Sequence, residues 1–419
     1  MSNKDKSAMS EQKSAQRTLV PELRFPEFRE AGEWHEKKLA QFLTESRIEG
    51  SAGDIAKKIT VKLWGKGVFA KRESIKGSEN TKYYKRRAGQ FIYSKLDFLN
   101  QAFGIVPKEL DGFESTVDLP CFDIGEELDP VFLLEYVKRE GFYKKNGEVA
   151  DGGRKAKRIQ AEMFLSFPIV LPIQKAEQQK IADCLSSLDD LIMAENQKLD
   201  AIRNQKKGLM QQLFPREGET IPRLRFPEFR AAEAWKEAAL STWIDLISGL
   251  HLAPDEYADA GDVPYFTGPS DYANDLALVS KWTSHSVNSG RSGDILITVK
   301  GSGVGELLYL ELDEVAMGRQ LMAVRPKSVH GEFLFHFLAT QRQRLIALAS
   351  GNLIPGLSRG DILSLTALVP QREEQQAIAD CLSSLDDLIA VQNQKIDVLL
   401  VHKKGLMQRL FVAQSGVQE

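Results

Sequence analysis

An internal repeat constrains this chain more than any other feature of its sequence. Residues 20–29, Val-Pro-Glu-Leu-Arg-Phe-Pro-Glu-Phe-Arg, return 201 positions later as Ile-Pro-Arg-Leu-Arg-Phe-Pro-Glu-Phe-Arg at residues 221–230. The same offset places Trp235 at the position of Trp34. Similarity at a fixed spacing indicates duplicated structural units rather than one large domain.

A second and longer segment is repeated at nearly the same offset. Residues 177–214 match residues 374–411 at an offset of 197, and 27 of the 38 positions are identical. The sequences between the repeated segments, residues 40–170 and 241–367, share almost nothing. The order is therefore a short repeated segment, a variable domain and a long repeated segment, twice in succession. A chain of 419 residues has the length expected of two or three domains.

Both long segments have the apolar periodicity of a helix with a single seam. In the first copy, apolar residues alternate at spacings of four and three, which is the heptad pattern of paired helices. These residues are Ile181, Leu185, Leu188, Ile192, Leu199, Ile202, Leu209 and Leu213, and polar Glu195 and Lys206 interrupt the seam. A helix of about 38 residues is roughly 55 Å long. Because a single seam requires a partner, we expect the two copies to pair with each other, although the heptads fit either direction.

The variable regions combine short strands with turns. Ala88–Tyr93 and Ser292–Val299 each contain a turn glycine that leads into an apolar strand. Residues 159–171 and 362–369 occupy matching places, directly before the two long helices. We expect α+β domains, each with a small, curved sheet.

Charge is distributed unevenly, although the formal net charge is only −3. Residues 57–108 carry 13 Lys and Arg against three Asp and Glu, whereas residues 241–369 carry nine against fourteen. Only the first variable region therefore has the basic character typical of a phosphate-contacting surface. No apolar run is long enough for a membrane span, and three cysteines are too few for a disulfide framework. We expect a cytoplasmic, reduced protein.

Little in the sequence is typical of an enzyme. The glycine-rich run Lys300–Glu306 follows an apolar strand, but Leu307–Leu312 look extended rather than helical, which disfavours a nucleotide or S-adenosylmethionine site. No Pro-Pro dipeptide occurs, so the Asn/Asp-Pro-Pro-aromatic tetrapeptide of adenine methyltransferases is missing. The six histidines are scattered and form no metal-ligand pattern. We expect no catalytic site, no metal and no cofactor on this chain.

At its repeated segments the chain resembles the specificity subunits of type I restriction–modification systems. The resemblance rests on Leu-Arg-Phe-Pro-Glu-Phe with its following Trp, on the helix start Glu-Gln-x-x-Ile-Ala, and on the helix end Lys-Lys-Gly-Leu-Met-Gln-x-Leu-Phe, each present twice. It covers essentially the whole length after the N-terminal arm. It implies two target-recognition domains that read the halves of a bipartite double-stranded DNA site, and an antiparallel coiled coil that fixes the spacer.

The resemblance also implies partners. Two modification subunits would supply adenine methylation, and restriction subunits would add translocation and cleavage. S-adenosylmethionine, ATP and Mg²⁺ are accordingly expected on those partner subunits. A pseudo-two-fold chain presents equivalent surfaces twice and suits two copies of one partner. No interaction with a membrane is expected.

The expected fold class is α+β, with two globular target-recognition domains joined by two long helices in an antiparallel coiled coil and a pseudo-two-fold internal repeat. The expected boundaries follow the repeats. They are a flexible N-terminal arm at 1–19, a first target-recognition domain at 20–172, a first long helix at 173–214, a linker and second target-recognition domain at 215–370, a second long helix at 371–412 and a C-terminal tail at 413–419.

Candidate DNA contacts are basic, amide and aromatic side chains that we expect in loops of the two recognition domains. In the first domain they are Lys66, Tyr83, Tyr84, Lys85, Arg86, Arg87, Arg154, Lys155 and Arg158. In the second they are Lys300, Ser302, Arg319, Gln320 and Asn352. Lys and Arg can hold phosphates, and Arg can pair with a guanine edge through two hydrogen bonds. The alternative at each position is a solvated charged loop.

Two other functions remain open from the residues alone. The helices could be a dimerisation rod in an assembly protein that reads no DNA sequence, or the chain could be an enzyme with an unrecognised site. The paired acids Asp189–Asp190 and Asp386–Asp387 are typical of a solvated helix face, with a docking surface for the modification subunit as the alternative.

Overall fold

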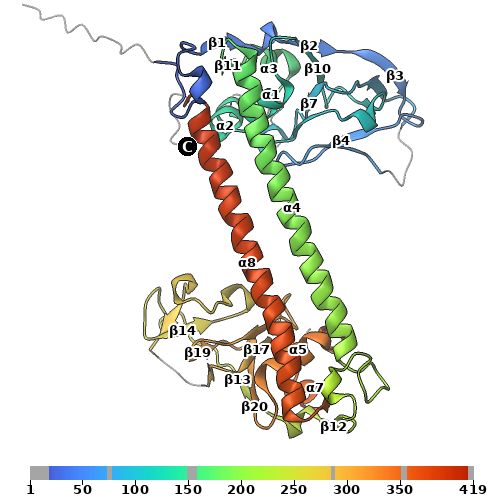
Figure 1. Cartoon of the computed structure of the whole chain (residues 1–419), viewed down its shortest axis with the longest axis vertical. Coiled ribbons are helices and arrows are strands. Elements are labelled where there is room, and N and C mark those ends of the chain that lie inside the picture. The colour runs from blue at the N-terminus through green and yellow to red at the C-terminus, as the bar shows by residue number, and fades with distance from the viewer. Residues whose placement is uncertain (1–17, 73–77, 149–157, 285–287, 351–355, 414–419) are drawn as a thin grey trace, which may run out of the picture. The chain divides into compact units, whose positions relative to one another are not determined.

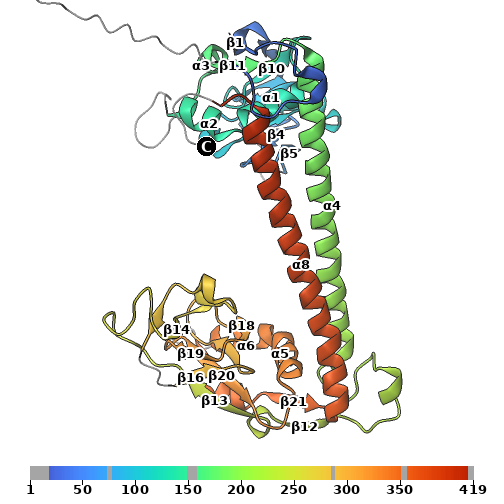
Figure 2. The same cartoon turned by 60° about the vertical axis from the view of Figure 1, so that its left-hand side comes forward.

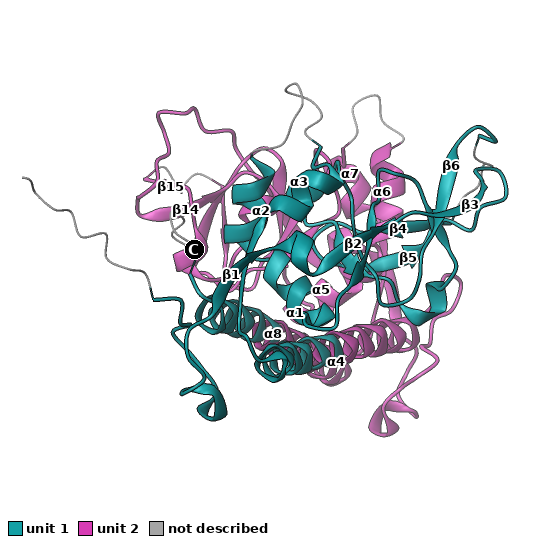
Figure 3. Ribbon diagram, turned by 90° about the horizontal axis from the view of Figure 1, so that it is seen from above, with its two compact units in different colours: residues 1–194, 396–419 teal, residues 195–395 magenta. Residues whose placement is uncertain are grey.

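Two compact units make up the chain (Figure 3). Unit 1 comprises Met1–Ala194 and Ile396–Glu419, and unit 2 comprises Glu195–Lys395. The computed structural model describes residues 18–72, 78–148, 158–284, 288–350 and 356–413. Most of the expected N-terminal arm and C-terminal tail lies outside these ranges. Among the described helices, none combines the length and apolarity needed to cross a membrane.

Both long repeated segments form continuous helices, as their periodicity predicts. Helix α4 spans Lys175–Leu213 and helix α8 spans Arg372–Leu410 (Figure 1). Gly208 and Gly405 remain within the helices, although glycine costs about 1 kcal/mol in a helix interior. Helix α4 begins in unit 1 and ends in unit 2, whereas α8 begins in unit 2 and ends in unit 1. Each unit therefore contains the start of one long helix and the end of the other.

The helix segments within unit 2 run antiparallel. Glu195 accepts hydrogen bonds from Gln392 and Lys395, and Lys206 donates to Asp386. Residue numbers rise along one helix while they fall along the other, which defines the direction. The two polar residues that interrupt the apolar seam therefore find polar partners on the opposite helix.

The helix segments within unit 1 have the same antiparallel direction. Lys403 donates to both carboxylate oxygens of Asp189 at 2.7 Å. One and two turns earlier on α4, Leu185 and Ile181 belong to the same core as Leu410 near the end of α8. The direction agrees with the one that the family resemblance implied and the heptads left open.

The two variable domains fold around four-stranded sheets with the same strand order. In unit 1 the order is β2 (Leu43–Ser46), β10 (Cys121–Ile124), β7 (Phe91–Tyr93) and β8 (Phe103–Ile105), and every neighbouring pair is antiparallel. In unit 2 it is β13 (Ile244–Ser248), β20 (Leu321–Pro326), β17 (Ile295–Thr298) and β18 (Leu307–Tyr309), again antiparallel throughout. Gly89 and Gly293 occupy the predicted turns before β7 and β17 with φ of 84° and 88°, a backbone region that favours glycine. Two sequences that share almost nothing thus form the same α+β sheet.

Equivalent elements flank the two sheets. In unit 1 they are α1 (Pro130–Val137), α2 (Glu140–Gly147), α3 (Ala161–Ser166) and the pair β1 (His35–Lys38) with β11 (Pro168–Leu171). In unit 2 they are α5 (Gly331–Thr340), α6 (Arg342–Ser350), α7 (Arg359–Leu363) and the pair β12 (Lys236–Ala239) with β21 (Thr366–Val369). Helix α5 lies against α8, as Figure 2 shows. The Ser383 hydroxyl on α8 donates to the Glu332 carboxylate of α5, and His336 Nε2 lies 3.3 Å from the same hydroxyl.

The units differ in the strands inserted between the strands of the main sheets. Unit 1 adds the sheet β3 (Ile48–Ala52), β6 (Lys82–Lys85) and β9 (Glu114–Ser115), and the hairpin β4 (Ile59–Val61) with β5 (Val68–Ala70). Unit 2 adds a sheet of β15 (Trp282–Thr283), β14 (Val263–Phe266), β19 (Glu314–Met317) and β16 (Ser289–Arg291), in which β14 and β19 are parallel.

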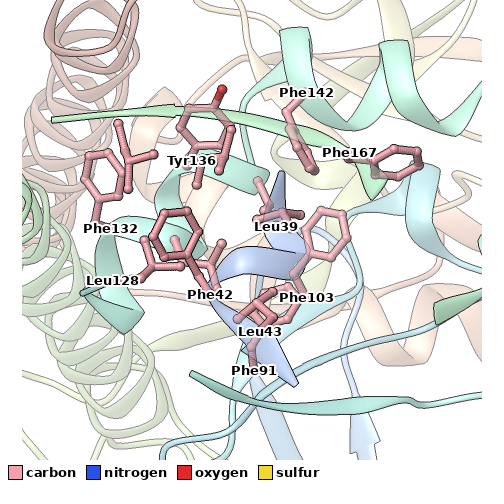
Figure 4. Close-up of a cluster of buried hydrophobic side chains, with 14 of the residues drawn as sticks. Leu39, Phe42, Leu43, Phe91, Phe103, Leu128, Phe132, Tyr136, Phe142 and Phe167 are labelled. Atoms are coloured by element: carbon pink, nitrogen blue, oxygen red, sulfur yellow. The ribbon is translucent and has the colours of Figure 1, made fainter. Parts of the chain in front are cut away.

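Each core is closed by the phenylalanine that follows the end of a long helix. In unit 1, Phe411 packs against Phe132 of α1 and Trp34, with ring centroids 5.2 and 6.3 Å apart. Figure 4 shows the same core, in which Phe132 and Tyr136 of α1 lie beside Phe42. Phe214 fills the equivalent position in unit 2 and packs against Phe333 and Trp235.

Repeated framework and candidate DNA-recognition surfaces

A buried ion pair, which we call the clasp, fastens the short repeated segment of unit 1 to the start of α4. The Nε and Nη2 atoms of Arg24 donate to the two carboxylate oxygens of Glu177, both at 2.7 Å. Trp34 Nε1 donates to the same carboxylate at 3.2 Å. The side chains of Arg24 and Glu177 are only 7% and 1% exposed. A paired, two-bond contact of this kind satisfies charges that would be costly to bury alone.

Unit 2 has the same clasp. Arg225 donates through Nε and Nη2 to Glu374, again at 2.7 Å, and Trp235 Nε1 donates at 3.4 Å. The exposed fractions of the two side chains are again 7% and 1%. The bond to Glu374 raises the pKa of Arg225, so the pair stays ionised. Recurrence of Arg24 and Trp34 at an offset of 201 and of Glu177 at an offset of 197 was the sequence signal for this contact, but their structural role was not predicted from it.

The residue after each clasp glutamate joins the helix start to its recognition domain. Gln178 donates from Nε2 to the Pro172 carbonyl and accepts from the Asp129 backbone N–H. Gln375 makes the equivalent bonds to the Pro370 carbonyl and the His330 backbone N–H. The domains are therefore held on the helices by the repeated residues, while the variable residues remain available for other contacts.

Four of the five candidate DNA contacts of unit 2 come together at one edge of its main sheet. Lys300 and Ser302 follow β17, whereas Arg319 and Gln320 precede β20, and these strands are antiparallel neighbours. The Val299 N–H donates to the Gln320 carbonyl at 2.8 Å, which joins the two loops. Lys300, Ser302 and Arg319 are exposed. The fifth candidate, Asn352, lies outside the described residues.

The glycine-rich run at this edge leads into a strand. Strand β18 begins at Leu307, as the sequence predicted for Leu307–Leu312. Gly301 and Gly305 have φ of 90° and 83°, so the loop requires glycine for its turns. No helix N-terminus stands behind the run within residues 299–310, all of which are described. The geometry is that of an exposed loop beside a sheet edge.

In unit 1 the candidates around β6 lie on the smaller sheet. Lys85 is exposed and Tyr83 and Tyr84 are half-buried on this strand, which pairs with β3 and β9. Arg87 is exposed two residues after the end of the strand. Lys66 is exposed in the turn between β4 and β5.

Arg86 does not belong to this surface, contrary to the expectation from the sequence. Its side chain is buried, and it donates to Ser115 Oγ and to the carbonyl oxygens of Ser46 and Leu119. Burial lowers the pKa of the guanidinium, and the three acceptors compensate its donors. Arg86 directly follows β6, and its side chain turns inward between exposed Lys85 and Arg87. Arg86 holds β6 in place and is not available to a phosphate.

The basic cluster before α3 is described only at its end. Arg158 is exposed and lies 3.7 Å from Asp118 across an ion pair. Arg154 and Lys155 lie outside the described residues.

Arg158 and Asp118 mark the sheet edge of unit 1 that is equivalent to the Lys300–Gln320 edge of unit 2. The Lys95 N–H donates to the Asp118 carbonyl, and the Ile159 N–H donates to the Lys95 carbonyl. The corresponding bonds in unit 2 are Val299 N–H to Gln320 and Leu357 N–H to Val299. By these hydrogen bonds Lys95 occupies the position of Val299, directly before Lys300. Lys95 is thus a further candidate that the sequence missed, because the two domains cannot be aligned by residue identity.

Among the described residues, no three His, Cys, Asp or Glu side chains are grouped closely enough to hold a metal ion.

The clasps and the long helices are repeated in both units, whereas the exposed residues at the sheet edges differ. The chain is thus built of two similar modules with different exposed edges. The chain belongs to the family of type I restriction–modification specificity subunits, because the type I restriction modification DNA specificity domain matches residues 130–204 and 233–400. Two relatives come from Methanocaldococcus jannaschii. The putative type I restriction enzyme MjaX specificity subunit is 25% identical over 69% of this chain and 68% of its own length. The MjaVIII specificity subunit is 25% identical over 70% of this chain and 71% of its own length.

Solved structures share the fold. The crystal structure of a type I restriction–modification S subunit from M. genitalium matches 95% of this chain and 100% of that chain, with a TM-score of 0.63 and 15% identity. A structure that describes complex assembly and conformational transition of a type I system matches 90% of this chain and 97% of that chain, with a TM-score of 0.53 and 18% identity.

Proposed function

We propose that each unit reads one half of a bipartite double-stranded DNA site, and that the paired helices set the spacer between the halves. The observation that carries the proposal is that the two units share the same clasp and the same long helices but have different residues at their sheet edges. The clasp is identical in both units, whereas the edge residues are Lys95 and Arg158 in unit 1 and Lys300 and Arg319 in unit 2. Side chains of this kind hold phosphates and read base edges. Two units with the same clasp and helices but different edge residues suit two half-sites of different DNA sequence.

We further propose that the chain directs catalytic partners and is itself non-catalytic. Two modification subunits would methylate adenine, and restriction subunits would translocate and cleave DNA. S-adenosylmethionine, ATP and Mg²⁺ would then be held by those partners, in the cytoplasm. The absence of a Pro-Pro dipeptide from the sequence supports this division of labour. Methyl transfer by the purified chain alone would contradict it.

Sequencing of genomic DNA for modified adenines tests the DNA-reading function. Cells that express the modification subunit of the same system are compared with and without this chain. We expect methylation at one two-part sequence with a fixed spacer only when the chain is present. Methylation without a consensus, or no dependence on the chain, would favour the alternative that the helices serve a scaffold without sequence readout.

A further inference from the structure

Three loops of unit 2 meet at one edge of its sheets. They are residues 267–271 after β14, residues 300–305 after β17 and residues 318–320 after β19. Strands β14 and β19 are parallel, so their carboxyl ends lie together. The Gly318 N–H donates to the Phe266 carbonyl, and the Val299 N–H donates to the Gln320 carbonyl, both at 2.8 Å. The turn that carries Gln320 is therefore fixed to both of the other loops.

The three loops pack closely around the Gln320 side chain. A Cβ atom added at Gly303 would lie 2.4 Å from Pro269 Cγ, so these two loops touch at a position where only glycine fits. Cβ atoms added at Gly268 and Gly301 would lie 3.2 and 3.4 Å from Gln320 Oε1, which is closer than an ordinary contact. The end of the Gln320 side chain thus lies over two glycines, at a place that all three loops determine.

The amide of Gln320 is available to a ligand. The side chain is half-buried, and no group within the described ranges forms a hydrogen bond with its amide. The carboxylate nearby on the 267–271 loop is already satisfied, because Asp271 accepts from Thr267 Oγ1 at 2.6 Å and from Lys281 at 3.0 Å. An amide presented in this way can exchange water for a ligand that offers one donor and one acceptor.

Two unneutralised cations lie beside the amide. Lys300 and Arg319 are exposed, and neither has a carboxylate at ion-pair distance in the part of the chain that the structure describes. Lys281, by contrast, is paired with Asp271 at 3.0 Å. Residues 241–369 as a whole are acidic, with nine Lys and Arg against fourteen Asp and Glu. Unpaired cations at this edge therefore attract a phosphate backbone to a region that otherwise repels it.

The chemistry of a primary amide selects one base. Its N–H group donates while its oxygen accepts, side by side. In the major groove adenine presents the matching pair, an acceptor at N7 and a donor at the N6 amino group. Guanine presents two acceptors there, so the amide oxygen would face an acceptor and lose its hydrogen bond.

We propose that Gln320 reads an adenine in the half-site bound by unit 2, from the major groove, while Lys300 and Arg319 hold phosphates beside it. The inference rests on the proposed function and names one base pair of its site. Methyltransferases extrude their target base from the duplex. The adenine read by Gln320 is therefore a different one from the adenine that the partner methylates.

The substitution Gln320→Met tests the assignment in cells, because methionine keeps the length of the side chain and removes the amide. Methylated sites are mapped in cells that express the variant with the modification subunit of the same system. The half-site of unit 2 is the one that is retained when residues 40–170 are exchanged. We expect one A·T pair of this half-site to become degenerate, while all other positions and the spacer are retained. Gln394→Met, at an exposed position of α8, is the matched control and should retain the full sequence.

Binding of duplex DNA by the purified complex of this chain with the modification subunit gives a second readout. 7-Deazaadenine lacks N7 and so removes the acceptor for the amide N–H. It is placed in turn at each adenine of the half-site that is not methylated. At one position we expect it to weaken binding by the unmodified complex about fivefold and to leave binding by the Gln320→Met complex unchanged.

A methylated sequence that Gln320→Met leaves unchanged, or relaxation at a G·C pair, would overturn the assignment. A unit 2 half-site with no A·T pair besides the methylated one would also overturn it. If Gln320→Met abolishes methylation, equal sensitivity of both complexes to 7-deazaadenine at every position would decide against a base contact. Failure of the unmodified chain to direct methylation to any two-part sequence would contradict the proposed function itself rather than the role of Gln320.

Discussion

Units 1 and 2 use the same clasp and the same sheet order, but one position between helix and domain differs. Glu135 of α1 contacts Lys403 at the end of α8, whereas the equivalent position in α5 is His336, which faces Ser383 and lies near Lys206. The framework tolerates an acid in one unit and a neutral ring in the other. The position is therefore buried in both units, although the residue that occupies it differs. Stability and recognition should therefore respond separately to mutation.

The largest effect is expected at the clasps. Glu177→Ala and Glu374→Ala each leave a buried guanidinium without its partner, so we expect each to lower the free energy of unfolding by about 3–5 kcal/mol. Because the two clasps are equally buried, the two losses should be similar. Urea denaturation measures them. Glu27→Ala, which removes an exposed pair with Lys180, is the control and should change little. A small loss of unfolding free energy at either clasp would mean that the two clasps do not stabilise their units equally.

Arg86 and Arg87 are neighbours with opposite expected behaviour. Arg86→Ala removes three hydrogen bonds of a buried guanidinium and should cost about 3 kcal/mol of folding free energy. Arg87→Ala should leave stability unchanged. If Arg87 contacts a phosphate, the variant should flatten the salt dependence of DNA binding by the assembled complex by about one unit of slope. A stable Arg86→Ala protein with weakened DNA binding would reverse this assignment.

The Glu135 and His336 difference predicts unequal acid sensitivity. Burial, and to a smaller extent Lys206, lowers the pKa of His336 to about 3. A histidine that is neutral when folded contributes stability above its ordinary pKa, and this stability is lost as pH falls below about 6.5 towards 3. For Glu135, burial opposes ionisation, but Lys138 and Lys403 outweigh it and lower its pKa, so its contribution is lost only below its ordinary value of 4.5.

The His336 contribution amounts to about 2 kcal/mol between neutral pH and about pH 5. His336→Gln should remove most of this pH dependence from the unfolding of unit 2. Chemical denaturation at the two pH values, followed by a fluorescent probe attached in unit 2, measures it. Equal pH dependence in both proteins would show that His336 is not the titrating group.

The smallest effect is expected from oxidation. Cys184 and Cys381 occupy the same repeat position but pack against the separate cores of unit 1 and unit 2. Cys184 precedes Glu195 on α4, and Cys381 precedes Gln392 on α8. Because the helices are antiparallel, the segments that precede this contact extend in opposite directions. A disulfide requires Cα atoms within about 7 Å. Mild oxidation followed by non-reducing electrophoresis and mass spectrometry should therefore give no intramolecular crosslink. An efficient Cys184–Cys381 bond would contradict the antiparallel pairing.

The helices and the turn glycines could be predicted from sequence because their signals are local. The heptads predicted α4 and α8, and Gly89 and Gly293 predicted the strand starts. The repeat could have indicated the clasp, since Arg24, Trp34 and Glu177 each recur. Inward orientation of Arg86 could not be predicted, because a basic run on a short strand gives no sign of which side chain faces the core. Lys95 was missed for a different reason, since its equivalence to the Lys300 region depends on tertiary hydrogen bonds.

Exchange of one recognition domain tests the central claim most directly. Residues 40–170 are replaced with the first variable region of another specificity subunit, while the clasp residues and both helices are kept. Modified adenines are then mapped in genomic DNA. If each unit reads one half-site, one half of the methylated sequence changes while the other half and the spacer are retained. A change in both halves, or a change in the spacer alone, would contradict the claim.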